Sequence, residues 1–265
     1  MLRYHLTDHR PPTTDHRPQT SDLRPQTSDL RPQNPPMSQP SQSPRRLLIR
    51  HLGRQPYEPV WAAMREFTDR RGPDTVDELW LVEHDPVFTQ GLAGKPEHVL
   101  NPGDIPIVQT DRGGQVTYHG PGQVVAYPLL DLKRLGLGVR CLVDRLEQSV
   151  IDVLAGQGIE GQRREGAPGV FVDQAKIASI GLKVRRDCTY HGLAFNVDMD
   201  LSPFALINPC GFAGLAMTDL GRLTETASWD GAAEALSTVI CQLLGYYPKY
   251  SQSASIVSMR LESVC

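Results

Sequence analysis

The chain has 265 residues, of which 40% are hydrophobic and 22% charged, and its formal net charge is −3. This is the composition of an ordinary globular protein that buries one sizeable core or two small ones. It offers no basic surface typical of nucleic-acid binding, and its apolar runs are far shorter than the roughly 18 residues of a membrane span.

The N-terminal region carries a tandem array of seven-residue units. Four copies of one unit, two of them reading TSDLRPQ, fill residues 6–33. Each unit has at least one proline and one leucine at most, so it can neither continue a helix nor bury enough apolar surface to fold. We therefore expect residues 1–44 to be a disordered tail. Met37 follows the array directly, as a second candidate start.

The body of the chain mixes apolar strand patterns with amphipathic helix patterns from about Arg45 onward. Strands outnumber helices, and several strands follow one another closely, which favours a mixed sheet over a strict βαβ repeat. The sequence thus predicts one α/β domain with a single mixed sheet at 45–250, and a polar tail at 251–265. In chain order we expect a strand at 46–51, a helix ending before Gly72, strands at 79–83, 105–109 and 124–132, a helix from 139 to Gly156, a hairpin of 169–172 with 176–184, a strand at 191–197 and a helix at 232–243.

A glycine-rich segment lies between two of these strands, at 112–123 (RGGQVTYHGPGQ). It matches neither the P-loop nor the dinucleotide fingerprint. Glycine density of this kind allows bare backbone to approach a ligand closely. His119 in its centre is either a donor to a substrate carbonyl or a hydrogen-bonded structural residue, and the same choice holds for Ser179 and His191.

Five widely spaced cysteines, without a CxxC pair, argue against a disulfide framework or a structural zinc site and favour reduced thiols. One of them, Cys210, stands between Pro209 and Gly211. A pinned, glycine-flanked loop suits a sulfur that is presented to a substrate, although cysteine is also a common small core residue.

Lys176 is the candidate partner of Cys210. Strand parity places it on one face with Ala178, Ile180 and Leu182, and Lys183 on the other. A lysine among apolar side chains is costly to bury as a cation and can act as a base at neutral pH. The alternative is that Lys176 begins its strand and reaches water.

Five segments together resemble the lipoyl(octanoyl) transferase family, in the family's order and over essentially the whole body. They are 111–121 (DRGGQVTYHGP), 169–171, 176–181 (KIASIG), 191–196 (HGLAFN) and 201–211 (LSPFALINPCG). The resemblance implies the α/β fold of biotin and lipoate protein ligases. It implies Cys210 as the nucleophile that carries an acyl thioester and Lys176 as its acid/base partner. The substrate pocket would be lined by Arg112, Gly113, Gly114, Gln115, Val116, Thr117, Tyr118, His119, Ser179, Ile180, Gly181, Gly192, Leu193 and Ala194.

The resemblance further implies an octanoyl donor, acyl carrier protein, and acceptor lysines on the lipoyl domains of 2-oxoacid dehydrogenase complexes and on the glycine cleavage H protein. A thioester donor is already activated, so we expect no cofactor and no metal. Backbone N–H groups near Gly181 or Gly211 are candidate donors to the oxyanion. Lys183, Arg185 and Arg186 either steer acidic partners or form a solvated face.

Two alternatives stay open at this point. An ATP-dependent lipoate or biotin ligase would share the fold but leave Cys210 without a task. A non-catalytic carrier-protein binding module would require an inert Cys210. We expect a cytoplasmic monomer that binds neither nucleic acid nor membrane.

Overall fold

The structure is a computed structural model that describes residues 45–251. The repeat array and the residues after Ser251 lie outside this range, so the expectation of a disordered tail remains a prediction. Within the described residues the strands form two sheets, of seven and three strands. The predicted α/β class is confirmed, while the second sheet was not predicted.

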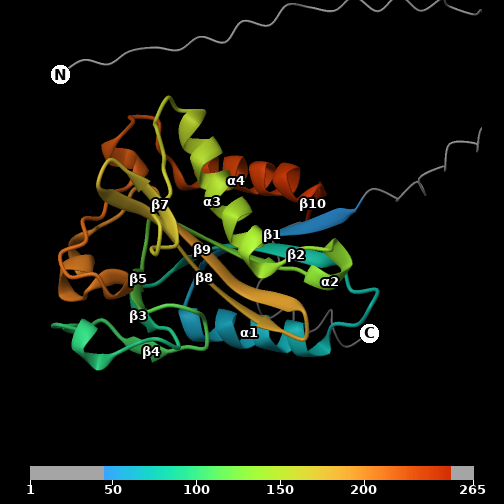
Figure 1. The fold of residues 1–265 in the computed structure, drawn as a ribbon, viewed down its shortest axis with the longest axis horizontal. Helices are drawn as coiled ribbons and strands as arrows, with labels where there is room; N and C mark the ends of the chain where they lie inside the picture. The colour runs from blue at the N-terminus through green and yellow to red at the C-terminus, as the bar shows by residue number, and fades with distance from the viewer. Residues whose placement is uncertain (1–44, 252–265) are drawn as a thin grey trace, which may run out of the picture. The chain divides into compact units, whose positions relative to one another are not determined.

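The seven-stranded sheet is mixed, in the order β10-β1-β2-β6-β9-β8-β7 (Figure 1). The pairs β10–β1 and β1–β2 are parallel and the remaining pairs antiparallel. Its strands are β1 (Arg46–Gln55), β2 (Asp77–His84), β6 (Gln123–Leu129), β7 (Gly169–Val172), β8 (Ala175–Arg185), β9 (Cys188–Asn196) and β10 (Tyr247–Tyr250).

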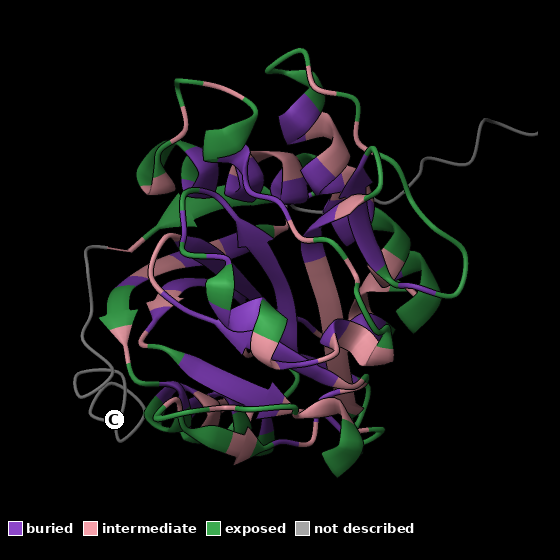
Figure 2. Ribbon diagram, turned by 90° about the vertical axis from the view of Figure 1, so that its left-hand side faces the viewer, coloured by how far each residue is buried: buried purple, intermediate pink, exposed green. Residues whose placement is uncertain are grey.

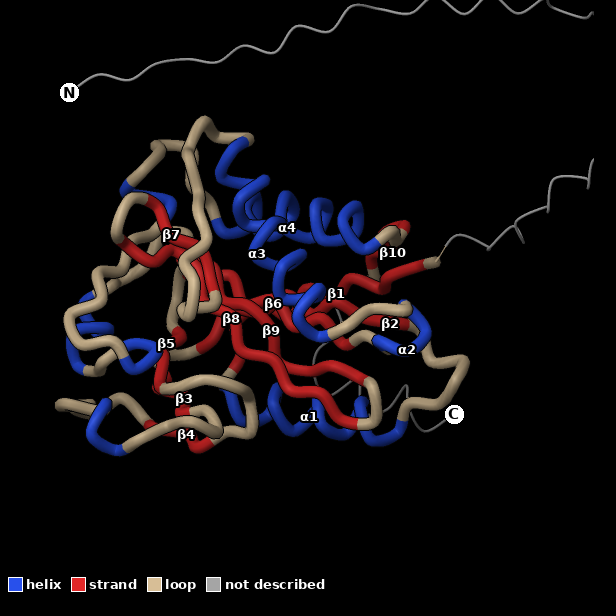
Figure 3. The backbone as a smooth tube through the Cα atoms, in the orientation of Figure 1, coloured by secondary structure: helices blue, strands red, loops and turns tan. Residues whose placement is uncertain are grey.

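The smaller sheet has the order β4-β3-β5, with β3 (Val87–Gln90), β4 (Ile107–Gln109) and β5 (Val116–His119). The helices are α1 (Tyr57–Arg70), α2 (Leu132–Leu135), α3 (Val139–Ala155) and α4 (Trp229–Leu244), and short 3-10 turns lie at Pro96–His98, Ser202–Leu206, Pro209–Gly211 and Leu220–Arg222. Long loops surround β5 and β7 (Figure 3).

Helices cover both faces of the main sheet, with α3 and α4 on one side and α1 on the other (Figure 1). The central strand β6 is buried at every position, and its sequence from Val124 to Leu129 contains no charged residue. Val124 and Ala126 belong to the core under α3 and α4, whereas Val125 and Tyr127 belong to the core under α1. A strand buried on both faces needs apolar residues at every position. Figure 2 shows the centre of the sheet buried, while most exposed residues lie in loops, on outer helix surfaces and on the edge strand β10.

Two predicted boundaries are wrong for local reasons. The strand predicted at 124–132 ends at Leu129, because the Asp131 side chain accepts a hydrogen bond from the Arg134 N–H and caps α2. The glycine-rich segment 112–123 is not all loop, since β5 occupies its centre and pairs with β3. The predicted helices and the 169–172/176–184 hairpin are confirmed, while β3 and β10 were not predicted.

Candidate active site

Cys210 lies in a tight turn between β9 and α4, within Pro209–Gly211. Its backbone is left-handed, with φ 57° and ψ 16°, a geometry that costs a non-glycine residue about 1–3 kcal/mol. The turn is held by the Asn208 N–H, which donates to the His98 carbonyl at 2.8 Å. The side chain is partly exposed, and its thiol forms no disulfide with the other cysteines of residues 45–251.

Lys176 lies at the start of β8 and is fully buried. Its Nζ donates to the Pro168 carbonyl at 2.8 Å and lies 3.3 Å from the Cys210 Sγ. The Phe171 ring centroid is 5.4 Å from the same nitrogen. Within residues 45–251 Lys176 forms no ion pair with a carboxylate. The Cys210 sulfur is therefore the neighbouring group that can carry the opposite charge.

The predicted strand parity of Lys176 is wrong, because β8 contains a bulge. Val170 pairs with Ala178 and Phe171 with Lys176, so Ile177 is an extra residue. Val170 and Ala178 belong to the core under α3 and α4, which does not include Phe171. Since paired residues share a face, Lys176 lies on the face of Phe171 and not with Ala178, Ile180 and Leu182.

A pocket of about 380 Å³ opens beside these two residues. Its wall joins β5, β6, β8, β9 and the segment before β7, and it includes both Cys210 and Lys176. The predicted residues on this wall are Arg112, Gly113, Gly114, Gln115, Thr117, His119, Ser179, Ile180, Gly181, Gly192, Leu193 and Ala194.

Val116 and Tyr118 do not lie on the pocket wall. They alternate with Thr117 and His119 along β5 and face a separate core beneath the small sheet. No strand was predicted within the glycine-rich segment 112–123, so this alternation was not predicted. Wall residues that no motif marks were also not predicted, among them Tyr57, Tyr127, Val139, Val143 and Phe212.

Glycines allow the strands around the pocket to approach one another. A Cβ on Gly192 would lie 1.9 Å from the Ala126 carbonyl oxygen, and one on Gly181 2.9 Å from the Gly113 oxygen. Both are closer than real Cβ contacts, so these positions cannot hold a side chain without backbone movement.

Arg112 is a second buried cation beside the pocket. Its guanidinium donates to the Thr89 hydroxyl at 2.9 Å and to the Gly113 carbonyl at 2.9 Å, both neutral groups. Burial lowers the pKa of Arg112, while the charge of a Cys210 thiolate would raise it. The guanidinium thus favours negative charge at this sulfur.

Three buried, hydrogen-bonded histidines lie at the pocket: His119 and His191 are on its wall, and His84 lies behind the wall residue Tyr127. Burial, with His84 nearby, lowers the pKa of His119 to about 3, and burial lowers that of His84 to about 4. Burial also lowers the pKa of His191, against the opposing effect of Asp111. His119 contacts Gln123 Oε1 at 2.7 Å and Thr89 Oγ1 at 3.3 Å, which fits a neutral structural residue.

Asp111 orients His191 from the edge of the site. Its carboxylate accepts hydrogen bonds from His191 Nε2 and Trp61 Nε1, each at 2.9 Å, and from the Tyr190 hydroxyl. Burial raises the pKa of the Asp111 carboxyl, but these hydrogen bonds outweigh it and hold the pKa below its usual range.

Two further expectations change with the structure. The Gly211 N–H donates to the Asn208 carbonyl at 2.9 Å and is not free to bind an oxyanion. Arg185 and Arg186 both pair with Asp69, at 3.1 and 3.2 Å, so part of the predicted basic cluster is neutralised. Lys183 has no such pair among residues 45–251.

No group of three His, Cys, Asp or Glu side chains among the described residues could hold a metal ion. In residues 45–251 no helix is both long and apolar enough to cross a bilayer.

Comparison with protein families finds the lipoyl protein ligase A/B catalytic domain over residues 56–241. An octanoyltransferase of Shewanella amazonensis is 60% identical over 202 residues, which cover 76% of this chain and 94% of that protein. An octanoyltransferase of Cellvibrio japonicus is 64% identical over 197 residues, 74% of this chain and 92% of that protein.

Among solved structures, a lipoate-protein ligase A bound with ATP superposes with a TM-score of 0.64 at 14% identity, covering 83% of this chain and 94% of that one. A bipartite lipoate protein ligase of Thermoplasma acidophilum gives a TM-score of 0.62 at 15% identity, covering 83% and 92%. At such low identity these likenesses show the fold alone.

Proposed function

The chain belongs to the lipoyl protein ligase A/B family, as one of its octanoyltransferases, and we propose that it carries the octanoyl group as a thioester on Cys210. It is an acyltransferase that serves lipoate synthesis. The observation that carries the proposal is the 3.3 Å contact between Lys176 Nζ and Cys210 Sγ beside a pocket with apolar walls.

In the first half-reaction the Cys210 sulfur attacks the carbonyl of the octanoyl thioester on acyl carrier protein. Lys176 accepts the thiol proton and returns it to the departing carrier thiol, so the sulfur–carbon bond of the donor is exchanged for that of the enzyme. Buried Arg112 supports negative charge on the sulfur.

In the second half-reaction a lysine amine of a lipoyl domain attacks the Cys210 thioester. Lys176 accepts the proton that the amine loses and passes it to the released sulfur, so the product is an amide, which is far more stable than a thioester. Val125, Val139 and Leu193 give the pocket apolar surface suited to an alkyl chain. The twelve predicted residues on the pocket wall are the proposed substrate-binding residues.

Acyl carrier protein and lipoyl domains are the partners of this reaction. We assign the acceptors more finely to the lipoyl domains of 2-oxoacid dehydrogenase complexes and to the glycine cleavage H protein, and we propose a monomer working in the cytoplasm. Lys183, beside the paired Arg185 and Arg186, supplies positive charge for an acidic partner.

The decisive experiment mixes the purified chain with octanoyl acyl carrier protein, without ATP, and weighs the intact protein. It should gain one octanoyl group, and Cys210→Ala should gain none. Cys141→Ala is the matched control, because Cys141 is an exposed cysteine on α3 that does not line the pocket.

Two outcomes would contradict the proposal. An adduct that maps to Cys141 or Cys188 would remove Cys210 from its role. Strict dependence on ATP, magnesium and free octanoate would instead make the chain a ligase, the activity named for the structural relative with bound ATP.

A further inference from the structure

Glu147 is a buried carboxylate on α3 that faces the segment leading into β7. It is 6% exposed. One oxygen, Oε1, accepts the Gly169 N–H at 2.8 Å, and the other, Oε2, accepts Arg163 Nε at 3.0 Å. A buried carboxylate on a backbone N–H fixes that peptide firmly, since such bonds are charge-assisted.

The Gly169 N–H and the Pro168 carbonyl are the two ends of one peptide group. The carbonyl end accepts Lys176 Nζ at 2.8 Å. Glu147, this peptide, Lys176 and the Cys210 sulfur therefore form one continuous chain of polar contacts. Its first member is an anion, and its third is a cation that forms no ion pair within residues 45–251.

The geometry of Gly169 keeps this peptide close to the lysine. Its φ is +131°, and a Cβ there would lie 2.6 Å from Lys176 Cε and 2.2 Å from the Ala178 oxygen. Only glycine meets both conditions. The peptide is thus held between α3 and Lys176 with no room for a side chain.

Resting on the proposed function, we propose that Glu147 is a positioning residue of the acyl-transfer site, which acts on Lys176 through the Pro168–Gly169 peptide. A carboxylate on the N–H makes the carbonyl oxygen a stronger acceptor, because hydrogen-bonded groups in a buried chain polarise one another. A stronger acceptor favours the ammonium form of Lys176. An ammonium 3.3 Å from Cys210 in turn favours the thiolate over the neutral thiol–amine pair.

Other charges act on the same chain. Arg163 contacts Glu147 from the segment after α3, and Arg112 acts on Cys210 from the β5 side. Neither contacts the Pro168–Gly169 peptide. The effect of Glu147 can therefore be separated from theirs by substitution.

The test measures alkylation of Cys210 by iodoacetamide against pH, in the full chain, with the modified peptide quantified by mass spectrometry. Glu147→Gln keeps an oxygen for the Gly169 N–H and nearly the same volume, but removes the charge. Alkylation at pH 7 should slow by roughly three- to tenfold, the size of one net hydrogen bond, and recover as the pH rises. The melting temperature tells whether the variant is folded.

Two variants separate this role from simple anchoring of the loop. Arg163→Met removes the partner of Oε2 and should not slow alkylation. In a Lys176→Ala background, Glu147→Gln should have no further effect, because its influence passes through the lysine.

The proposal is overturned if Glu147→Gln alkylates as the parent does, if Arg163→Met slows alkylation equally, or if the loss persists without Lys176. Alkylation needs no acyl donor, so these results do not depend on whether the chain transfers an octanoyl group. The mass experiment above tests that separately.

Discussion

Two non-glycine residues on the pocket wall, Cys210 and His191, have left-handed backbone conformations, each with φ 57°. Such residues persist only where surrounding contacts hold them, and they gather at functional sites. At Cys210 the turn sets the sulfur beside Lys176. We infer that part of the stability of this segment is given up for the position of the sulfur.

This strain predicts a difference between two substitutions that both remove the thiol. Cys210→Gly should be more stable than Cys210→Ala by about 1 kcal/mol, because glycine adopts the left-handed region without a Cβ penalty. Urea unfolding of the two variants measures the difference. Equal stability would mean that the turn relaxes once the sulfur is gone.

Lys176 is predicted to move protons and not only to supply charge. Lys176→Ala should lower octanoyl transfer by roughly two to four orders of magnitude, the usual loss for a general acid/base. Lys176→Arg should be nearly as damaging, because a guanidinium does not release its proton at this pH. The rates of transfer to a lipoyl domain measure both. Near-normal transfer by the arginine variant would place proton transfer elsewhere.

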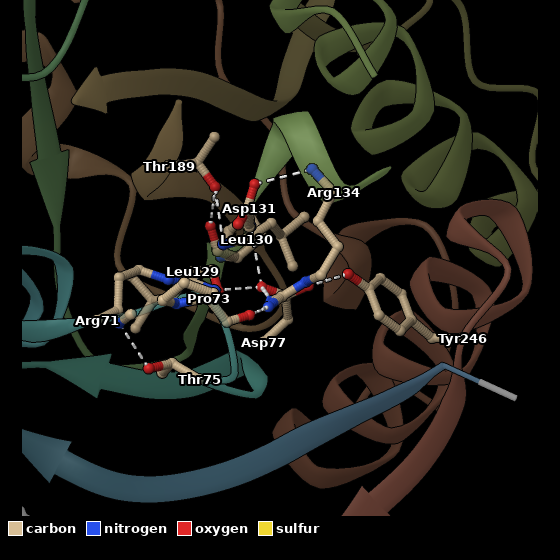
Figure 4. A network of polar contacts seen from close by, with 12 residues as sticks. Arg71, Pro73, Thr75, Asp77, Leu129, Leu130, Asp131, Arg134, Thr189 and Tyr246 are labelled. Atoms are coloured by element: carbon tan, nitrogen blue, oxygen red, sulfur yellow. Dashed lines mark hydrogen bonds and ion pairs between the residues drawn. The ribbon is translucent and has the colours of Figure 1, made fainter. Parts of the chain in front are cut away.

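Several elements meet at one buried carboxylate, Asp77, at the start of β2 (Figure 4). Its Oδ1 accepts Arg71 at the end of α1, Arg134 on α2, and the Asp131 N–H. Its Oδ2 accepts the Tyr246 hydroxyl, between α4 and β10. Burial and the neighbouring Asp77 raise the pKa of Tyr246, so this hydroxyl keeps its proton.

Removal of this carboxylate should be costly, since it leaves Arg71 buried without its anion. Asp77→Ala should lower the free energy of unfolding by about 3–5 kcal/mol. Asp85→Ala is the control, because its pair with Arg54 is about half exposed and should contribute at most about 1 kcal/mol. Chemical denaturation of both variants tests this, and a small loss at Asp77 would show that water replaces it.

The elements that were predicted are those whose pattern is repeated along several residues. The stripe of α3 and the doubly buried run of β6 are long enough to be read from the sequence. β10 was missed because all four of its residues are exposed, so no apolar pattern marks it. The bulge at Ile177 was missed because it depends on the pairing with β7 and not on β8 itself.

The site was predictable where residues lie within one motif. Cys210 and Lys176 could be paired through family resemblance, whereas Glu147 and Tyr127 come from other elements and no local pattern links them to the pocket. Eight separate segments line the pocket, and only their packing brings its side chains together.

At the scale of the whole chain, the N-terminal repeats are predicted to be dispensable. All described helices and strands lie between Arg46 and Tyr250. A chain starting at Met37 should therefore keep the melting temperature and the transfer rate of the full chain. A melting temperature lower by several degrees would show that the repeats pack on the body.

The buried histidines predict how the stability of the whole molecule depends on pH. His84 contacts the Gln55 carbonyl at 3.0 Å and the Tyr127 hydroxyl at 2.8 Å, which joins β1, β2 and β6. The pKa values of His84 and His119, about 4 and about 3, lie below the unfolded value of about 6.5. The unfolded chain therefore binds more protons between these values, and the free energy of unfolding falls as the pH drops from about 6.5 toward 4 and below.

For His84 alone this loss should reach roughly 3 kcal/mol. His84→Gln cannot take up this proton, so its stability should fall less steeply over the same pH range, although it starts lower because a packed ring is lost. His51→Gln is the control, since that ring is partly exposed and lies at the edge of Trp229. Denaturation at pH 7.5, 6, 5 and 4 gives the slopes. The free energy of unfolding of His84→Gln could instead fall in parallel with that of the parent chain. Proton uptake by other groups would then cause the acid unfolding, and His84 would take up its proton in the folded chain without loss of its contacts.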